Sequence, residues 1–151
     1  MRTFLMLLFT VFATQASANE MTIDDLRNLK YIEVIIADDA TDACWTNLRE
    51  SREYAEEKLR SVGATLYNGE EKSHGEYYAL SLYVSSERQE NSQLCFGGID
   101  IQLMTGSIIN GFFHLALTPV SAKQSFMGVD NVNNAMIEAI QELFNGPIFD
   151  N

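Results

Sequence analysis

Apolar residues are concentrated in seven segments of the chain, and their spacing predicts alternating stretches of strand and helix. The β-branched run at 31–37 predicts a strand that is buried on both faces. Apolar positions three and four residues apart predict helices over 43–62 and 131–144, each with one apolar stripe. A short apolar piece and three longer alternating patterns predict further strands at 64–67, 77–84, 94–104 and 111–120.

This order of elements predicts the fold class. An α/β (α+β) two-layer sandwich is expected, with a mostly antiparallel sheet of four to five strands and two main helices on one face. The strand at 31–37 is followed by a long crossing helix, so it is the strand expected to have a parallel neighbour. Asp42 and Asp130 are expected to cap the two helices, and Gly63 is expected in a left-handed conformation after the first.

Two local rules conflict between the last two strands. Asn110-Gly111 is a strong signal for a two-residue hairpin turn. That register, however, turns the apolar side of 111–120 away from the core, because a slip of one residue exchanges the two faces of a strand. We therefore expect a bulge or a longer loop at Gly106, which places Leu103 opposite Phe113 and Ile101 opposite Leu115.

The first eighteen residues predict a secretory signal peptide, which leaves 19–151 as a single α/β domain. Arg2 precedes an apolar run at 4–12, and the small residues Ala16-Ser17-Ala18 form a cleavage site. No later stretch approaches the length that a membrane span needs, so no transmembrane anchor is expected. The mature protein is therefore expected in the periplasm or outside the cell.

The charge balance excludes one class of partner. The 151 residues include 10 basic and 21 acidic side chains, and removal of Arg2 with the signal peptide lowers the net charge from −11 to −12. A protein that binds nucleic acid needs the opposite field, so nucleic acid is excluded as a partner. The hydrophobic content of 46% excludes intrinsic disorder.

Two cysteines, Cys44 and Cys95, predict one disulfide in an exported chain. Closing a loop of this size stabilises a protein by about 4 kcal/mol on the chain-entropy model. Cys44 falls on the apolar stripe expected of the first helix, and Cys95 on the core side of its strand. The bridge is therefore expected to join helix to sheet. No metal site is expected, since the only histidines, His74 and His114, have no ligand spacing, and no cofactor motif is present.

The arrangement resembles an uncharacterised family of small secreted bacterial α/β proteins with one disulfide. The resemblance rests on the strand Tyr31 to Ala37, the Cys44-bearing start of an amphipathic helix, the ending Leu59-Arg60-Ser61-Val62-Gly63, the strand that carries Cys95 and the closing helix. The chain departs from the family in lacking a tryptophan between Leu117 and Ser121. The resemblance implies an α/β fold and export, and it brings no activity.

Two polar groupings are candidates for chemistry. Asp38, Asp39 and Asp42 follow the first strand, where they are expected to cap the helix or form a solvated acidic loop. His114 is expected to face Asp100 across the outer side of the sheet, and a histidine held by a carboxylate is the beginning of acid–base chemistry. No nucleophile with a glycine-flanked turn accompanies them, so no catalytic residue is assigned.

The sheet face turned away from both helices is the candidate binding surface. Its expected binding residues are Tyr31, Tyr77, Tyr83, Phe112 and His114. Aromatic side chains among polar neighbours on an uncovered sheet are typical of a protein-binding patch, for a partner or for a second copy. In the alternative, loops 68–75 and 85–93 or the segment at 19–30 cover this face.

Three functions are compatible with these features. An exported non-catalytic binding or adaptor protein that uses the aromatic sheet face is the leading hypothesis. An acidic periplasmic inhibitor or immunity protein against a basic enzyme or toxin is the alternative, because the net charge would speed that encounter. A small hydrolase built on His114 is the third.

Overall fold

The computed structural model describes residues 31–68, 77–109 and 112–146. The expected signal peptide and the segment up to residue 30 therefore lie outside the described residues. The elements follow the order β1 (Ile32–Ala40), α2 (Leu48–Ser61), β2 (Tyr77–Arg88), β3 (Cys95–Ile109), β4 (Phe112–Val129) and α3 (Asn133–Phe144). No helix in these residues is long and apolar enough to cross a membrane.

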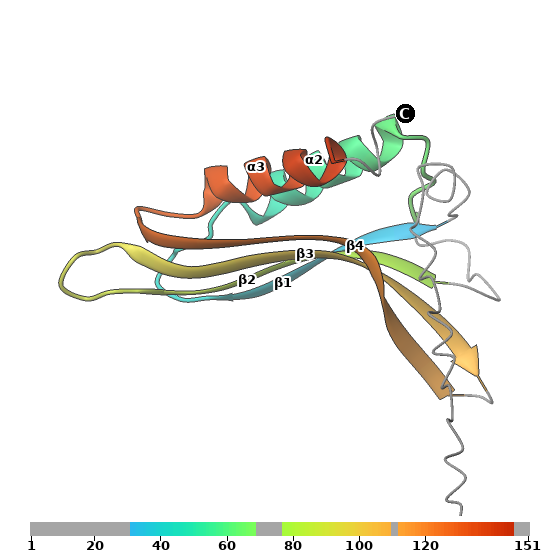
Figure 1. Cartoon of the computed structure of the whole chain (residues 1–151), viewed down its shortest axis with the longest axis horizontal. Helices are drawn as coiled ribbons and strands as arrows, with labels where there is room; N and C mark the ends of the chain where they lie inside the picture. The colour runs from blue at the N-terminus through green and yellow to red at the C-terminus, as the bar shows by residue number, and fades with distance from the viewer. Residues whose placement is uncertain (1–30, 69–76, 110–111, 147–151) are drawn as a thin grey trace, which may run out of the picture.

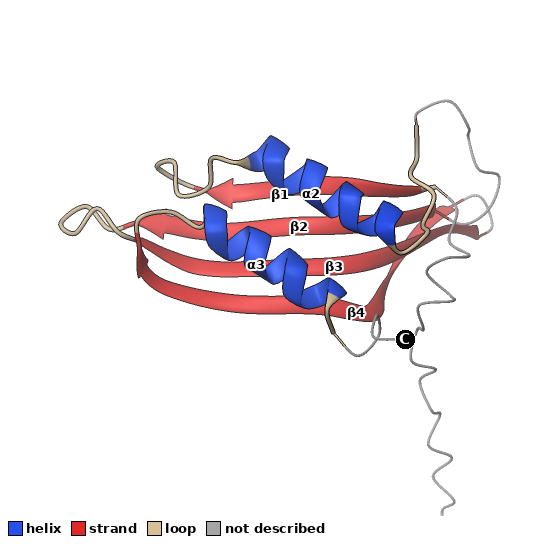
Figure 2. Ribbon diagram, turned by 90° about the horizontal axis from the view of Figure 1, so that it is seen from above, coloured by secondary structure: helices blue, strands red, loops and turns tan. Residues whose placement is uncertain are grey.

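The described elements form two layers, with both helices on one face of a single sheet (Figure 1). The sheet has four strands in the order β1-β2-β3-β4, and Figure 2 shows the helices lying over it along the strands. β1 and β2 are parallel, while the other two pairs are antiparallel. The parallel pair needs a crossover, and α2 supplies it. The predicted fold class and the predicted parallel neighbour of the first strand are confirmed. The strand predicted at 64–67 is not formed, because only Leu66 pairs there, in an isolated bridge to Ile32, and the described sheet has four strands.

The core lies between the helices and the sheet. Alternate residues of each strand point toward the helices and are buried, as the period of two requires. Full burial of one such side chain is worth about 1.5–3 kcal/mol. The centre of this layer is at most 1% exposed and consists of Leu82, Ile101, Ala55, Leu59, Met136 and Ile140.

The helix α2 begins at Leu48, five residues after the predicted start. Asp42 and Ala43 have φ values of 52° and 58°, so the chain turns there and Asp42 does not cap the helix. Asn47 is the residue before the first helical turn, and its backbone oxygen accepts a 2.9 Å hydrogen bond from the N–H of Ser51. Gly63 follows the helix with a φ of 90°, which confirms its predicted left-handed conformation.

The predicted disulfide between Cys44 and Cys95 is present, with a Cα–Cα distance of 5.8 Å. Cys44 lies in the loop before α2 rather than on the helix, which corrects the expected helix-to-sheet bridge. The bond joins this loop to the first residue of β3, and both cysteines are fully buried. The pairing was predictable because it follows from cysteine count, whereas the place of Cys44 depends on where the chain turns.

The helix α3 begins at Asn133, and Asp130 does not cap it as predicted. The side chain of Asn133 reaches back to the start of α2, where its Oδ1 accepts hydrogen bonds from the N–H groups of Thr46 and Asn47, at 3.0 and 3.3 Å. The N–H of Val132 also donates to the carbonyl of Cys44, at 2.9 Å. These bonds join the two helix starts, so tertiary contacts place the first turn of α3 two residues after the predicted start.

The β3–β4 hairpin contradicts the predicted bulge at Gly106. Ile109 pairs with Phe112, which is the two-residue register that Asn110-Gly111 favours, and the register shift occurs between Gln102 and Met104. Opposite this shift, the Thr118 hydroxyl donates to the carbonyl of Leu103 at 2.8 Å. The adjacent Pro119 has no N–H to give to the ladder, which explains why the irregularity falls there.

The same hairpin is longer than predicted and extends past the end of β2. Tyr77, the first residue of β2, pairs with Gly106, so the residues of β3 from 107 onward have no neighbour on that side within the described chain. Beyond the bulge the hairpin bends away from the helices (Figure 1). The predicted register assumed that the start of β4 packs under a helix. The start of β4 instead lies in the part of the hairpin that bends away from the helices, so the two-residue turn decides the pairing.

Candidate functional site

The sheet face turned away from the helices, here called the outer face, is defined by the residues that alternate with the core positions. In the described chain no helix packs on it. Residues 85–88 belong to β2, and the rest of the loop predicted at 85–93 is a turn at the end of the sheet, so this loop does not cover the face (Figure 1). The other segments expected as possible covers, 19–30 and the loop at 68–75 from residue 69 onward, lie outside the described residues. The central members of the outer face are Glu33, Ile35, Asp39, Tyr77, Ser81, Tyr83, Phe96, Asp100, Gln102, Lys123 and Met127.

Two tyrosines of β2 are hydrogen-bonded to carboxylates of β1 on this face. The Tyr77 hydroxyl donates to Oε2 of Glu33 at 2.7 Å, and the Tyr83 hydroxyl reaches Oδ2 of Asp39 at 3.4 Å. Burial, followed by the hydrogen bond and the negative charge of Glu33, raises the pKa of Tyr77 to about 12. Each carboxylate thus orients an aromatic ring on the outer face.

The structure describes the side chains of three of the five predicted binding residues. Tyr77 and Tyr83 lie on the outer face, and Tyr31 precedes β1 with a φ of 67° and is half-buried. The backbones of Phe112 and His114 lie in the hairpin beyond the end of β2, opposite Ile109 and Ser107. Their side chains lie outside the described residues, so the predicted patch as a whole stays a prediction.

The predicted pair of His114 and Asp100 is not formed in the sheet. Asp100 lies between Tyr83 and Lys123 in the register, seven positions along β3 from Ser107, the partner of His114. Lys123 Nζ is 2.9 Å from Asp100 Oδ2, so the carboxylate is paired with an ammonium group instead. This arrangement removes the geometric basis of the hydrolase hypothesis. The hairpin register places Lys123 opposite Asp100, and sequence analysis missed it.

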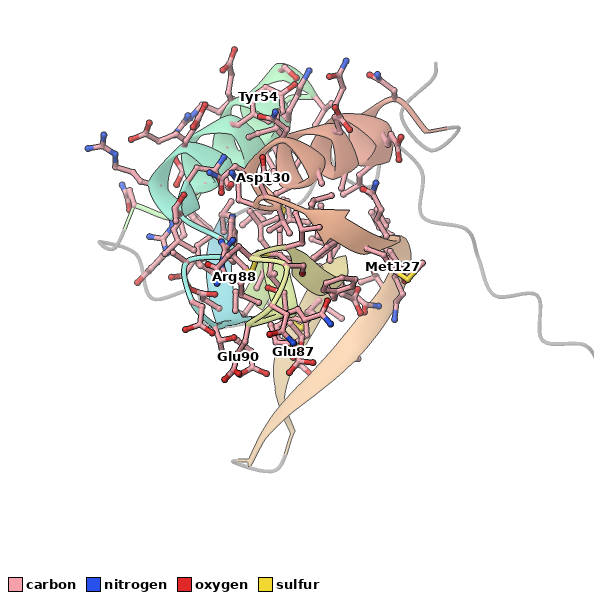
Figure 3. The ribbon with its side chains drawn as sticks, turned by 90° about the vertical axis from the view of Figure 1, so that its left-hand side faces the viewer. Tyr54, Glu87, Arg88, Glu90, Met127 and Asp130 are labelled. Atoms are coloured by element: carbon pink, nitrogen blue, oxygen red, sulfur yellow. A yellow bond between two sulfur atoms is a disulfide. The ribbon has the colours of Figure 1, made fainter. Side chains whose placement is uncertain are left out.

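A shallow depression that sequence analysis did not find lies at the end of the outer face near the β2–β3 turn. We call it the acidic hollow. Two adjoining cavities of about 390 and 580 Å³ share Glu87 and Phe96 as walls. The first adds Asp39, and the second adds Glu90. Figure 3 shows Glu87 and Glu90 pointing away from the helices, with Met127 at the side of the same end of the sheet.

The acidic hollow adjoins the most exposed large apolar side chain among the described residues. Met127 is 83% exposed and pairs in register with Phe96, a wall of the hollow. Tyr83, at 37% exposed, stands beside Asp39 on the other side. A hollow with carboxylate walls and an apolar rim suits a partner that presents both cationic and apolar groups.

Arg88 holds the loops behind the acidic hollow together. Its guanidinium donates to the carbonyls of Asp42 and Ala43, at 2.9 and 3.4 Å, to that of Asp130 at 3.0 Å and to that of Gln93. These carbonyls belong to the β1–α2 loop, the β2–β3 turn and the residues before α3. These bonds fix the position of Arg88, which keeps its positive charge and is itself a wall of the second cavity. The carboxylates of Asp39, Glu87 and Glu90 outnumber this one cation in the hollow.

Two of the three aspartates predicted to follow the first strand, Asp38 and Asp39, lie within β1, and Asp42 does not cap α2 as expected. Asp38 Oδ1 accepts a 3.0 Å hydrogen bond from the N–H of Ala40, and Asp39 is bound by Tyr83. Within residues 31–68, 77–109 and 112–146, no three histidine, cysteine, aspartate or glutamate side chains are grouped to hold a metal ion. These aspartates therefore shape the end of the sheet and its charge.

Comparisons with known proteins give only distant likenesses in fold. No family model and no curated protein matches the chain. Among solved structures, the chain is similar to two crystal forms of the PelC dodecamer from Paraburkholderia phytofirmans, each 13% identical, with TM-scores of 0.46 and 0.44. The first likeness covers 85% of this chain and 91% of PelC, and the second 78% and 87%. A hypothetical protein from Chlamydia trachomatis is 10% identical, with a TM-score of 0.34 over 64% of this chain and 74% of that one.

Proposed function

We propose that this protein is an exported, non-catalytic binding or adaptor protein that contacts another protein, or a second copy of itself, through the outer face. The observation that carries the proposal is the one-sided sheet. Both described helices lie on one face, while the other presents Tyr77 and Tyr83 beside carboxylates. The disulfide supports localisation of the protein to an oxidising compartment.

The chemistry of the outer face favours protein recognition over a small-molecule site. Tyrosines at protein interfaces combine an apolar ring with a polar tip, and their few rotatable bonds limit the entropy lost on binding. Here the hydrogen bonds to Glu33 and Asp39 hold both rings before a partner arrives. The surrounding side chains are small, polar or half-buried, among them Ser81, Asp100 and Gln102. A broad, preorganised and mixed surface of this kind matches the composition of transient protein interfaces.

Capture from an envelope extract of the organism that makes the protein tests this function. Residues 19–151 serve as bait, beside the variants Tyr83→Ala and Tyr77→Ala. Tyr54→Ala is the control, because Tyr54 lies on α2, on the opposite side of the sheet from the outer face. We expect the outer-face variants to lose the captured protein and the control to retain it. Equal capture by all four proteins contradicts the proposal.

Self-association is tested separately. Analytical ultracentrifugation of residues 19–151 over a range of concentrations reports any reversible oligomer, and Tyr83→Ala should shift it toward the monomer if the outer face is the interface. An oligomer that is unaffected by both tyrosine variants places the interface elsewhere.

The acidic hollow favours a second candidate function, an inhibitor or immunity protein against a basic enzyme or toxin. Its carboxylates, Asp39, Glu87 and Glu90, line the two cavities together with the half-buried Phe96, and the exposed Met127 pairs with Phe96, in a chain of net charge −11. Such a field accelerates encounter with a cationic enzyme, and salt weakens it because charges farther apart than about 8–10 Å are screened at physiological ionic strength.

Inhibition of a basic lysozyme tests the second candidate. The double variant Glu87→Gln/Glu90→Gln should reduce the association rate, and the control Glu138→Gln/Glu142→Gln makes the same charge change on the exposed side of α3. A panel of cationic periplasmic toxins extends the test. If the wild-type protein inhibits none of these enzymes at low salt, or if both double variants behave alike, the second candidate is contradicted.

A further inference from the structure

β1 is an edge strand whose outer side is free along its middle. The N–H of Ile32 donates to the carbonyl of Thr65, and its carbonyl accepts from the N–H of Tyr67, at 2.9 and 3.0 Å. These bonds show that the backbone groups of Ile32 point away from β2. Because that orientation recurs every second residue, the N–H and C=O groups of Val34, Ile36 and Asp38 point the same way. In the described chain these groups have no backbone partner on that side.

The two edges of the sheet differ in how they are protected. The other edge is β4. It contains Pro119, which lacks an N–H, beside a register shift, and it also carries Lys123. Proline, bulges and lysine are the usual devices that prevent a further strand from adding to a sheet. The edge of β1 has none of these from Val34 to Asp38. At its end, Asp38 Oδ1 covers the N–H of Ala40.

A cleft adjoins the Val34 end of this free edge. It has a volume of about 330 Å³ and lies between the start of β1, α2 and the segment around Tyr67. Within it Arg60 is paired with Glu56 at 2.9 Å, while Arg52 has no ion pair among the described residues. A strand added to β1 would therefore have room for a side chain beside Val34, with a cationic group available to polar acceptors.

Charge on the outer side of the edge selects the occupant. Glu33 and Asp39 flank Ile35 and Ala37 along β1, and both carboxylates are exposed and lack a described ion pair. In an antiparallel pairing of two copies centred on Ile36, Glu33 of each copy would lie beside Asp39 of the other. Like charges directly opposite are destabilising, so a second copy is disfavoured in that register. A strand with cations at both ends is favoured.

We propose that the free edge of β1, from Val34 to Asp38, is a second contact surface. It accepts an extended segment of a protein partner that carries lysine or arginine beside Glu33 and Asp39 and small apolar side chains between them. The backbone of this segment would pair with Val34, Ile36 and Asp38 and extend the sheet by one strand, which is a common mode of peptide recognition. This surface shares Glu33 and Asp39 with the outer face, but it also uses the backbone groups of Val34, Ile36 and Asp38, which the outer-face proposal does not use. Protection of these amides reports on the edge alone, so the two proposals can fail separately.

Amide exchange with defined peptides tests the proposal. The probe is the peptide Lys-Thr-Val-Thr-Val-Thr-Lys with blocked ends, whose palindromic pattern presents the same charges in parallel and antiparallel pairing. The control peptide has glutamate in place of both lysines. At a free concentration of about ten times Kd, the lysine peptide should slow hydrogen exchange of the Val34 and Ile36 amides about tenfold. Exchange at β4 should stay unchanged, and the glutamate peptide should give no protection.

Two sets of variants identify the contacts. Glu33→Gln/Asp39→Asn should weaken the lysine peptide roughly two- to tenfold, as expected for the loss of two exposed ion pairs. Glu50→Gln/Glu57→Gln makes the same charge change on α2 and should leave binding unaltered. Ile36→Pro should abolish binding by removing an outward N–H that the β1–β2 ladder does not use. If Ile36→Pro does not fold, Asp38→Pro removes the next outward N–H at an exposed position.

Several outcomes would overturn the proposal. Equal protection by both peptides would contradict the charge selection, and protection at β4 or nowhere would contradict the site. Protection of Val34 and Ile36 without peptide would show an edge that is already occupied. If that protection rises with protein concentration, the occupant is a second copy, and if it does not, the occupant is a segment of the same chain.

Discussion

The hydroxyl of Tyr77 on β2 lies 2.7 Å from Oε2 of Glu33 on β1 and donates a hydrogen bond to it. This contact links two parallel strands on the outer face and keeps the tyrosine protonated. It connects the fold to the proposed function, because the same bond that holds the ring in place opposes its ionisation. Its consequences are measurable in the isolated protein.

Stability should fall as the pH rises through the alkaline range in which this tyrosine titrates. The pKa of Tyr77 is raised from 10.0 to about 12 by burial and by Glu33. The unfolded chain therefore loses this proton first, so the stabilising contribution is complete below pH 10 and is lost between pH 10 and about 12. Tyr77→Phe should flatten that part of the stability profile, measured by urea unfolding at closely spaced pH values.

Removing the carboxylate provides the matching control. Glu33→Gln should lower the pKa of Tyr77. The measurement is tyrosinate absorbance against pH in three proteins: wild type, Glu33→Gln and Tyr77→Phe, the last of which identifies the signal of Tyr77. An unchanged Tyr77 titration in Glu33→Gln would show that Glu33 does not contribute to the shift.

Replacing Arg88 with lysine should destabilise the end of the molecule that carries the acidic hollow. Arg88 donates to carbonyls of three separate segments, and an ammonium group cannot reproduce this planar fork. Hydrogen bonds from charged groups are worth about 1.5–3 kcal/mol each, so the free energy of unfolding should fall by about 2 kcal/mol. Arg49→Lys is the control, because Arg49 is 90% exposed and has one 3.7 Å contact. Equal midpoints of urea unfolding would contradict the role assigned to Arg88.

Gly97 and Gly98 are adjacent, yet alanine should be tolerated at only one of them. A Cβ on Gly97 would lie 2.1 Å from the carbonyl oxygen of Ser85 and 2.7 Å from Cα of Ser86, both in the backbone of β2. At Gly98 the nearest atom, the carbonyl oxygen of Gln124, is 3.5 Å away. Gly97→Ala should therefore cost about 1–3 kcal/mol through forced backbone movement.

Gly98→Ala should change the free energy of unfolding by less than about 0.5 kcal/mol. Thermal unfolding of the two variants under identical conditions makes the comparison. Similar losses in both would mean that the strands relax around the added methyl group, contrary to this prediction.

Removing the disulfide should cost much of the net stability. Cys44 and Cys95 are separated by 51 residues, and closing such a loop stabilises by about 4 kcal/mol on the chain-entropy model. The double variant Cys44→Ser/Cys95→Ser should unfold at much lower urea concentration, followed by the fluorescence of the buried Trp45. Because both sulfurs are fully buried, reductant should act on the native protein only as fast as it opens. Rapid reduction without loss of structure would argue against that burial.

Much of the fold was predictable because it depends on local spacing. The period of two located β2, and the spacing of three and four located both helices, since one face of each element must be buried. The position of α2 as a crossover made β1 and β2 parallel. The count of two cysteines predicted the disulfide, and Gly63 predicted the left-handed end of α2. None of these features depends on which distant residues finally meet.

The sequence by itself determined the element types, the sidedness of the sheet and the covalent bridge, because apolar periodicity and cysteine number are properties of short segments. Only the tertiary structure decided that Asp100 meets Lys123 and not His114, that α2 starts after the Cys44 loop, and that Glu87 and Phe96 line one hollow with Met127 beside Phe96. The contacts of Asp100 with Lys123 and of Phe96 with Met127 depend on the β3–β4 register. A two-residue turn and a bulge in β4 around Pro119 set that register where the hairpin bends away from the helices, so the apolar pattern alone could not specify it.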